Sequence, residues 1–323
     1  MSYRGVLGLA KTRFIFATDL HGSELVWRKF LNSAKYFGVD ALIISGDTTG
    51  KMVIPIVKRP DGKYEATLLG TSYVIKEEEL PEFQKKVRFM SYYPYVCDRD
   101  EYERMKEDKK YMDDLFKRLM VETWEYWLSL IPERVPDHVR VVITPGNDDD
   151  FIIDEVIKKN PRVIFGEGEV LDLDGEHEVA TCGWTTPTPW NTFRECSEEE
   201  LLEKLEAVIA KIQNMDTAVF CFHCPPYGTP LDECPLLDEN LKPVTVRGDV
   251  VMTHAGSKSV RYVIEKYQPL VSLHGHIHES FGFCKIGRTY CVNPGSEYAE
   301  GILRAFLVEI DGKKVKRLQR IEA

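Results

Sequence analysis

Five short apolar runs, each followed at once by Gly, Asp or His, constrain the fold of this chain more than any other feature of its sequence. The runs are RFIFATDLHG, ALIISGD, VRVVITPGND, TAVFCFHCPP and LVSLHGHIH. Apolar runs of about five residues bounded by turn formers are typical of strands that are buried on both faces. Helical periods separate some of the runs, as in residues 197–215, which open with a capping box of Ser197 and Glu200. The alternation of buried strands and helices predicts a layered α/β domain.

The pattern changes between about residues 51 and 136. From about Asp100 to Ile131, apolar residues keep helical spacing and predict a long amphipathic helix. Asp-Gly pairs predict hairpins at three places in the chain, residues 61–62, 174–175 and 311–312. We therefore interpret residues 1–323 as a single domain that is interrupted at about 51–136 by an insertion, consisting of a hairpin and the long helix.

The aromatic content of the predicted long helix bears on the role of the insertion. The helix carries Trp124, Trp127 and further aromatic residues, which is more apolar surface than one face of a lone helix can leave in water. Packing against its own domain accounts for such a stripe without any further function. A lid over the site and a contact in a symmetric homo-oligomer are the functional alternatives, and of these we favour the oligomer.

Composition excludes several classes of protein. A hydrophobic fraction of 43% suffices for a sizeable core, and the net charge of −10 argues against a broad nucleic-acid-binding surface. No stretch approaches the roughly 20 apolar residues of a membrane span. The first residues, MSYRGVLGLAKTRFIFATD, contain no convincing signal-peptide cleavage site. The eight cysteines, including the close pair Cys221 and Cys224, are scattered, several of them within apolar runs, and indicate buried reduced thiols in a cytoplasmic protein.

Polar residues of a few chemical kinds collect just beyond the predicted strands, where ligands bind in α/β sheets. These residues are Asp19, His21, Asp47, Asn147, His223, His276 and His278. Each one alone has a structural explanation, such as capping a helix or stabilising a turn, but the whole set on successive strand ends does not. Carboxylate, amide and imidazole groups are ligands of divalent Mn, Fe or Zn. Seven such residues suit two ions that lie about 3.5–4 Å apart.

The order of these residues resembles that of the calcineurin-like metallophosphoesterases, D-x-H, G-D, G-N-x-D, H and G-H-x-H. In this chain the motifs run from Asp19 to His278, which is most of the sequence, and all five stand in order. The stretches HCPPYGTPLD and LHGHIHES also resemble the Icc-related predicted phosphoesterases of prokaryotes. The resemblance implies a β-sandwich that is flanked by helices and surrounds a site with two metal ions.

The resemblance also implies which residues bind each ion. One ion would be bound by Asp19, His21, Asp47 and His278, and the second by Asp47, Asn147, His223 and His276. Asp47 would bridge the two ions. A hydroxide held between them would be the nucleophile, because two cations lower the pKa of bound water.

One motif departs from the family pattern. Where the family has Gly-Asn-His-Asp, this chain has Asp148 in place of the histidine that is thought to assist the leaving group. A carboxylate beside two cations is expected to have a depressed pKa, to donate no proton and to repel a phosphomonoester dianion.

We interpret Asp148 and His254 as catalytic candidates, with His254 as the candidate acid. His254 lies just upstream of a predicted helix that opens at residues 256–259, whose free N–H groups would suit a phosphate oxygen. The alternative is an ordinary capped helix next to a surface histidine.

The expected function is that of a metal-dependent phosphohydrolase acting on a small phosphate ester, with a phosphodiester as the favoured substrate. A phosphomonoesterase or a nucleotide pyrophosphatase is the alternative within the same class. A non-catalytic scaffold of the same fold is a further alternative, but such a protein is expected to have lost ligand positions, and here every position is filled. Neither a nucleic acid nor a membrane is expected as a partner.

Overall fold

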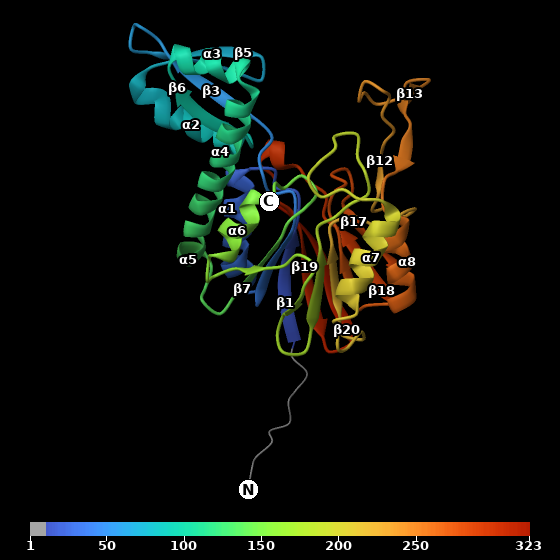
Figure 1. Cartoon of the computed structure of the whole chain (residues 1–323). Helices are drawn as coiled ribbons and strands as arrows, with labels where there is room; N and C mark the ends of the chain where they lie inside the picture. Colours follow the sequence, from blue (N-terminus) through green and yellow to red (C-terminus); the bar gives the residue numbers. More distant parts are fainter. Residues whose placement is uncertain (1–10) are drawn as a thin grey trace.

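Two six-stranded sheets pack face to face in the computed structural model, which describes residues 11–323 (Figure 1). The first sheet has the order β20-β19-β1-β2-β7-β8, with bounds Lys314–Glu322, Arg304–Asp311, Lys11–Ala17, Ala41–Ser45, Arg140–Thr144 and Ile164–Phe165. The second has the order β17-β18-β16-β11-β10-β9, with bounds Gly282–Ile286, Thr289–Asn293, Val271–Leu273, Val219–Phe222, Glu178–Cys182 and Val170–Asp172. The expectation about a signal peptide falls partly on residues 1–10, outside the described part.

Strand β1 shows how the sequence builds the layers. Phe14 and Phe16 point into the core between the two sheets, whereas Ile15 and Ala17 point into the core beneath the helices. Successive side chains of a strand face opposite sides of the sheet, so a run that is apolar at every position must be covered on both faces. This is why the runs noted in the sequence do not alternate.

Helices cover the outer face of each sheet. The first sheet is covered by α1 (Glu24–Phe37), α4 (Lys109–Ser129), α5 (Ile131–Arg134) and α6 (Ile152–Lys158), and the second by α7 (Glu198–Ile209) and α8 (Lys258–Tyr267). The result is a four-layered arrangement of helices, sheet, sheet and helices. The predicted α/β fold, a β-sandwich flanked by helices, is confirmed.

Residues 53–97 form a lobe that projects from the sandwich at the upper left of Figure 1. Its sheet has the order β5-β4-β3-β6, with bounds Thr71–Ile75, Tyr64–Leu68, Val53–Lys58 and Tyr93–Cys97, and helix α2 (Leu80–Phe89) lies beside it. The lobe has a small apolar cluster of its own around Ile56 and Val87. The hairpin expected at residues 61–62 connects β3 and β4, but it belongs to a four-stranded sheet that the sequence did not reveal.

The predicted long helix is divided at Asp108 into α3 (Arg99–Glu107) and α4, because the Asp108 side chain caps the start of α4 by accepting a hydrogen bond from Tyr111 N. The aromatic stripe of α4 packs against its own domain. Trp127 stacks on Trp27 of α1 with ring centroids 5.2 Å apart, and Trp124 meets Trp27 edge-on at 5.7 Å. Packing within the chain therefore accounts for this stripe.

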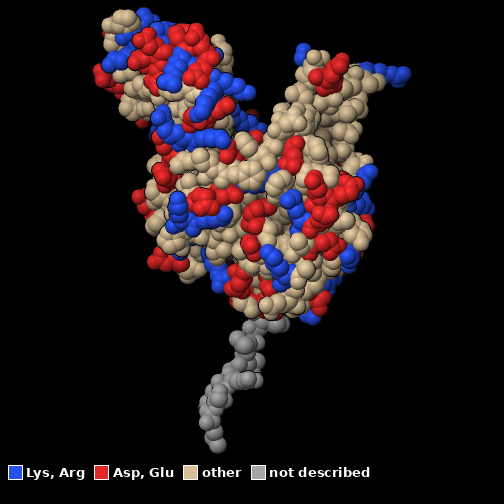
Figure 2. All heavy atoms as spheres, in the orientation of Figure 1, with Lys and Arg blue, Asp and Glu red and all other residues tan. Residues whose placement is uncertain are grey.

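A second projection, the arm, is formed by residues 233–254 on the other side of the sandwich (Figure 1). It contains β12 (Glu233–Pro235) paired with β15 (Met252–His254), and β13 (Thr245–Val246) paired with β14 (Asp249–Val250). Figure 2 shows charged residues of both signs on the lobe and at the outer end of the arm.

Three smaller expectations can be compared with the structure. The Asp-Gly pairs at 174–175 and 311–312 lie in the hairpins β9–β10 and β19–β20, as predicted. All eight cysteines are free thiols. Within residues 11–323 no helix has both the length and the apolar character that crossing a bilayer requires.

Candidate metal centre

The seven predicted ligand residues lie together at the carboxyl ends of the parallel strands of both sheets. Asp19 and His21 follow β1, Asp47 follows β2, Asn147 follows β7, His223 follows β11, and His276 and His278 follow β16. Strands β1, β2 and β7 are mutually parallel, as are β11 and β16, so their ends meet at one edge. Two groups of potential ligand atoms lie there, and within each group all of these atoms are within 4.8 Å of one another. The first group consists of Asp19, His21 and His278, and the second of Asp47, His223 and His276.

Four of these residues have left-handed backbone conformations. They are Asp19 with φ 54°, His21 with φ 41°, Asp47 with φ 49° and His276 with φ 68°. Such conformations cost non-glycine residues about 1–3 kcal/mol each and persist only where the surroundings impose them. Hydrogen bonds between the loops do this: Asp19 N donates to Gly46 O at 3.0 Å and His21 N to Asp47 O at 2.9 Å. These backbone conformations set the directions in which the four side chains leave the loops, and the side chains meet in the two ligand groups.

Glycines of the motifs allow the loops to approach each other closely. A Cβ on Gly46 would lie 2.4 Å from the Cα of Gly146, and one on Gly275 would lie 1.9 Å from Thr18 Oγ1. Any larger residue would separate the loops and hence the side chains that they carry. The glycine of G-D and the glycine of G-H-x-H are therefore required by packing at the site.

The first group is centred on imidazole nitrogens. His21 Nε2 lies 3.0 Å from His278 Nε2, which in turn lies 3.5 Å from Asp19 Oδ1. The Asp19 carboxylate is held in place because its Oδ2 accepts hydrogen bonds from His276 N at 3.0 Å and Thr18 Oγ1 at 2.7 Å.

The second group adjoins the first through Asp47. Asp47 Oδ2 lies 3.3 Å from His223 Nε2 and 3.9 Å from His21 Nε2, so this oxygen stands between the two groups. The other oxygen, Oδ1, accepts a hydrogen bond from Asp148 N at 2.8 Å. This position between the groups is the one that a bridging carboxylate requires.

Hydrogen bonds to the outer atoms leave the inner atoms available as ligands. His223 Nδ1 donates to Ser45 O at 2.6 Å, so Nε2 is the nitrogen that faces Asp47. Asn147 Nδ2 donates to Thr192 Oγ1 at 2.7 Å, which leaves Oδ1 free. Asn147 Oδ1, His223 Nε2 and His276 Nδ1 are buried and have no hydrogen-bond partner among the described residues. Buried polar atoms are almost always paired, so three unpartnered atoms of these kinds at the strand ends fit divalent cations.

Electrostatics tie the protonation of the second group to Asp47. Burial lowers the pKa of His276 to about 4. Burial also disfavours the charged form of His223, but the Asp47 carboxylate outweighs it and raises the pKa of His223 to about 9. The pKa of Asp47 is held well below its usual range by His223, although burial acts in the opposite direction. A proton on His223 therefore balances the Asp47 charge, and a bound cation would replace it.

Comparison with solved structures identifies the architecture. One solved structure aligns over 97% of this chain and 99% of its own with 17% identity and a TM-score of 0.56. The TT1561 protein of Thermus thermophilus aligns over 94% of this chain and 99% of its own with 14% identity and a TM-score of 0.51. The chain shares the fold of these two proteins, and its two sheets flanked by helices match the β-sandwich that the resemblance to the calcineurin-like metallophosphoesterases implies.

Sequence comparison reaches less far. A curated protein of Methanocaldococcus jannaschii, described as uncharacterized, is 34% identical over 161 residues, which is 49% of this chain. The matching part of this chain spans 65% of that protein's length, slightly less than two thirds. No family model matches the sequence.

Two of the three consecutive aspartates have structural roles. Asp149 accepts hydrogen bonds from Thr48 N and Thr49 N, both at 2.9 Å, and from Gly146 N at 3.0 Å, so it joins the loops after β2 and β7. Asp150 accepts a hydrogen bond from Ile152 N at 2.9 Å, at the start of α6. Neither carboxylate belongs to the two ligand groups.

Asp148 lies at the rim of the first group, with 27% of its side chain exposed. Its Oδ2 lies 3.6 Å from His21 Nδ1 and 3.6 Å from Lys51 Nζ. Burial, followed by the Asp47 charge, raises the pKa of Asp148 to about 7, while Lys51 lowers it. The sequence predicts a depressed pKa for Asp148 on the condition that two cations lie beside it. The surrounding protein groups alone raise the pKa of Asp148 instead.

His254 contacts none of the ligand residues through any hydrogen bond or ion pair seen in residues 11–323. Its Nδ1 lies 2.9 Å from Asp232 Oδ1, at the base of the arm. The start of α8 is also occupied, because Glu198 accepts hydrogen bonds from Lys258 N at 2.7 Å and Ser259 N at 2.9 Å. The interpretation of this helix start as a phosphate site is therefore wrong, and the capped helix is the arrangement found.

Three residues of the site were missed in the sequence. Lys51 faces Asp148, Thr192 orients the Asn147 amide, and the ring of Tyr298 lies 4.7 Å from that of His21. Lys51 follows Asp47 by only four residues, and this proximity was the one available signal. Thr192 and Tyr298 lie in loops without a recognisable motif.

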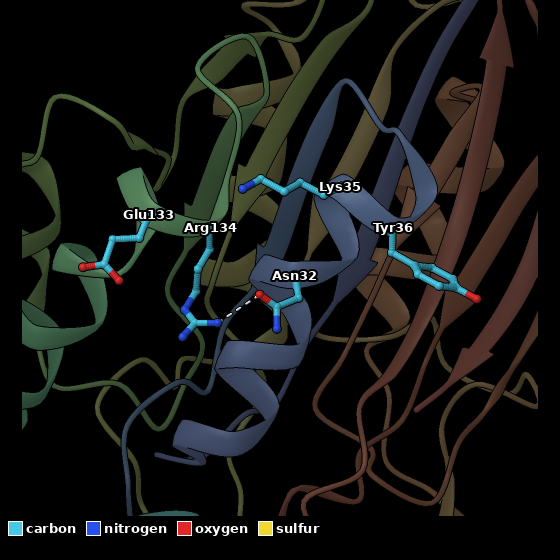
Figure 3. Close-up of a pocket in the computed structure, with 5 residues that line it drawn as sticks. All are labelled: Asn32, Lys35, Tyr36, Glu133 and Arg134. Atoms are coloured by element: carbon cyan, nitrogen blue, oxygen red, sulfur yellow. Dashed lines mark hydrogen bonds between the residues drawn. The ribbon is translucent and has the colours of Figure 1, made fainter.

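A hollow elsewhere on the surface is unrelated to this centre. It has a volume of about 620 Å³ and lies between α1 and α5 (Figure 3). Its lining residues are Asn32, Lys35, Tyr36, Glu133 and Arg134. In it Arg134 Nη1 donates to Asn32 Oδ1 at 3.0 Å. The hollow adjoins the last turns of α1, whereas His21 immediately precedes the first turn, so the two regions lie at opposite ends of this helix.

Proposed function

We propose that this protein is a metal-dependent phosphohydrolase whose seven residues Asp19, His21, Asp47, Asn147, His223, His276 and His278 bind two divalent cations of Mn, Fe or Zn. The observation that carries the proposal is that Asn147 Oδ1, His223 Nε2 and His276 Nδ1 are buried without a hydrogen-bond partner among the described residues, while His223, His276 and Asp47 offer ligand atoms within 4.8 Å of one another. Bound cations would supply Lewis acidity and an activated water, which hydrolysis of a phosphate ester requires. The chain's own part is to orient these ligands through Ser45 O and Thr192.

A phosphodiester is the proposed substrate class. Asp148 stands where the family has a histidine, so this position offers no imidazolium to protonate a poor leaving group. A diester with a phenolate leaving group needs little protonation. The missing acid favours phenolate leaving groups, and the Asp148 charge, which the Lys51 ammonium offsets in part, disfavours a monoester dianion more than a diester monoanion.

The test combines metal analysis with turnover. Purified protein is loaded with Mn, its metal content is measured, and hydrolysis of bis(p-nitrophenyl) phosphate is compared with that of p-nitrophenyl phosphate and a nucleotide diphosphate ester. Two ions per chain and faster diester turnover are expected. Faster turnover of the monoester or the diphosphate ester would instead support the phosphomonoesterase or the pyrophosphatase. A metal-loaded protein that hydrolyses none of them would support the scaffold.

A further inference from the structure

Two cysteines of the second sheet lie directly opposite each other. Cys284 is on β17 and Cys291 is on its antiparallel neighbour β18, and the two residues are partners in the register of this pair. Opposite residues of an antiparallel pair point to the same face of the sheet, with Cα atoms about 4.5–5.5 Å apart. A disulfide requires Cα atoms about 4.4–6.8 Å apart. The backbone therefore already holds the two cysteines at the separation that the bond requires.

The two side chains lie on the face of the sheet that α7 and α8 cover. Cys291 is fully buried in the apolar cluster there, and the partly buried Cys284 packs against the same cluster. Cβ atoms of opposite residues are about 4.5–5.5 Å apart, whereas those of a disulfide are about 3.8 Å apart. Because β17 is an edge strand with a neighbour on one side only, it can approach β18 by this difference without disturbing another strand.

The surroundings make Cys284 the more reactive of the two thiols. A hydrogen bond from the Cys291 thiol lowers the pKa of Cys284, and Arg261 acts in the same direction, although burial opposes both. The same hydrogen bond and burial raise the pKa of Cys291 well above its usual value. Each of the other six cysteines also has a raised pKa. Since the thiolate is the form that attacks a disulfide, Cys284 is expected to react first.

We propose that Cys284 and Cys291 form a reversible modification site, at which a small external disulfide such as oxidised glutathione converts the two thiols into a bond between β17 and β18. The Cys284 thiolate attacks one sulfur of the external disulfide and releases the first thiolate. The Cys291 thiol then loses its proton, attacks Cys284 Sγ in the mixed disulfide and releases the second thiolate. The protons from the two cysteines pass to the two released thiolates, so two protein thiols are oxidised while one external disulfide is reduced to two thiols.

The bond would link the edge strand of the second sheet to a strand that supports the metal centre. β18 ends at Asn293, whose Nδ2 donates to Gly275 O at 2.9 Å, and Gly275 begins the G-H-x-H motif. An edge strand has one row of unpaired backbone groups and opens more readily than an inner strand. The disulfide would therefore restrict the opening of β17. Neither cysteine belongs to the two ligand groups, so the inference is independent of the proposed function.

The principal test treats the reduced, full-length protein with oxidised glutathione, alkylates the remaining thiols and measures the products by mass spectrometry. The wild type is expected to lose two hydrogen atoms and to yield a peptide in which Cys284 is linked to Cys291, and dithiothreitol should reverse the change. Cys291→Ser should stop at the mixed disulfide, with one glutathionyl group on Cys284. Cys284→Ser should form neither product, because Cys291 is buried.

Cys234→Ser is the matched control. Cys234 is also partly buried on a strand of an antiparallel pair, but the residue opposite it is Thr253. The control should form the link at the wild-type rate, and Cys284 of the wild type should react roughly tenfold faster than Cys234. A wild type that forms no link, or that takes up glutathione at Cys234 as fast as at Cys284, would overturn the inference.

Hydrogen exchange measures the effect of the bond on the edge strand. Backbone amides of residues 282–286 are expected to exchange about tenfold more slowly in the oxidised protein than in the reduced protein. Equal exchange in the two forms would contradict the proposed restriction of β17.

Discussion

Asp47 belongs to the second ligand group and also adjoins the first, because its Oδ2 lies 3.3 Å from His223 Nε2 and 3.9 Å from His21 Nε2. Replacing Asp47 with Ala would remove this oxygen from between the two groups. We expect loss of both ions and a fall in diester turnover on the order of 1000-fold, since several kcal/mol of charge stabilisation are lost. Metal analysis and turnover measure the two effects.

Asp150→Asn is the control for Asp47→Ala, because Asp150 directly follows the G-N-x-D motif but accepts a hydrogen bond from Ile152 N at the start of α6 and belongs to neither ligand group. It should retain both ions. Full activity of Asp47→Ala in buffer treated with a chelator would contradict a centre of two metals.

Thr192 determines which atom of the Asn147 amide faces the ligand group. Its Oγ1 accepts from Asn147 Nδ2 and donates to Glu195 Oε1 at 2.5 Å. Thr192→Val removes both bonds and should weaken one of two metal-binding steps by about 10–100-fold, as is typical for partners behind the ligands. Calorimetric titration with Mn measures this effect. Thr188→Val, which also loses a bond to Glu195 but does not contact Asn147, should leave both binding steps unchanged; a similar loss in both variants would disprove the specific role of Thr192.

The hairpin β9–β10 is joined to the hairpin β19–β20 by a buried histidine. His177 Nδ1 lies 2.6 Å from Asp174 Oδ2, and its Nε2 lies 2.9 Å from Gly312 O. Both partners are acceptors, so the ring satisfies them only when it is protonated. Burial disfavours the charge, but the Asp174 hydrogen bond outweighs it and raises the pKa of His177.

A pH dependence of stability follows from the raised pKa of His177. Its contribution is fully present below the unfolded-state pKa of about 6.5 and is lost as pH rises through the higher folded-state pKa. The urea midpoint of the wild type should therefore fall between pH 6 and pH 9 by more than that of His177→Gln. Parallel curves for the two proteins would show that His177 contributes nothing to this dependence.

The elements that could be predicted from the sequence were those marked by a pattern of neighbouring residues. The five strand ends and the seven polar residues beyond them lie in short, uniformly apolar runs, and parallel strands bring such ends together. The lobe sheet was missed because β5 is largely exposed and its residues show no buried alternation. The start of α8 was misjudged because its partner, Glu198, is 60 residues away in sequence. Lys51 and Asp148 are far apart in sequence, so their contact depends on the tertiary fold.

At the scale of the molecule, the buried tryptophans of α4 test whether the insertion supports the monomer or an assembly. Trp124 is 1% exposed and packs on Trp27. We expect Trp124→Ala to lower the free energy of unfolding by about 3–5 kcal/mol, by the same amount at low and high micromolar concentration. Tyr126→Ala, on the exposed side of the same helix, should have a small effect.

A destabilisation by Trp124→Ala that grows with protein concentration would indicate that α4 contributes to a contact between chains. The homo-oligomer expected from the sequence stays a prediction, but the aromatic stripe no longer supports it. Sedimentation of the wild type at micromolar concentration measures the assembly state directly.

Each ligand group takes residues from both sheets: Asp19 and His21 follow a strand of the first sheet and His278 one of the second, and Asp47 faces His223 and His276 in the same way. Bound ions would therefore link the two sheets of the sandwich at this edge, and the sheets would separate there more easily once the ions are removed. Removing them with a chelator should lower Tm by roughly 10 °C, since ligand at about 1,000 times Kd contributes about 4 kcal/mol. Re-adding Mn should restore it. If chelation left Tm unchanged, the two sheets would be held together by their shared core alone.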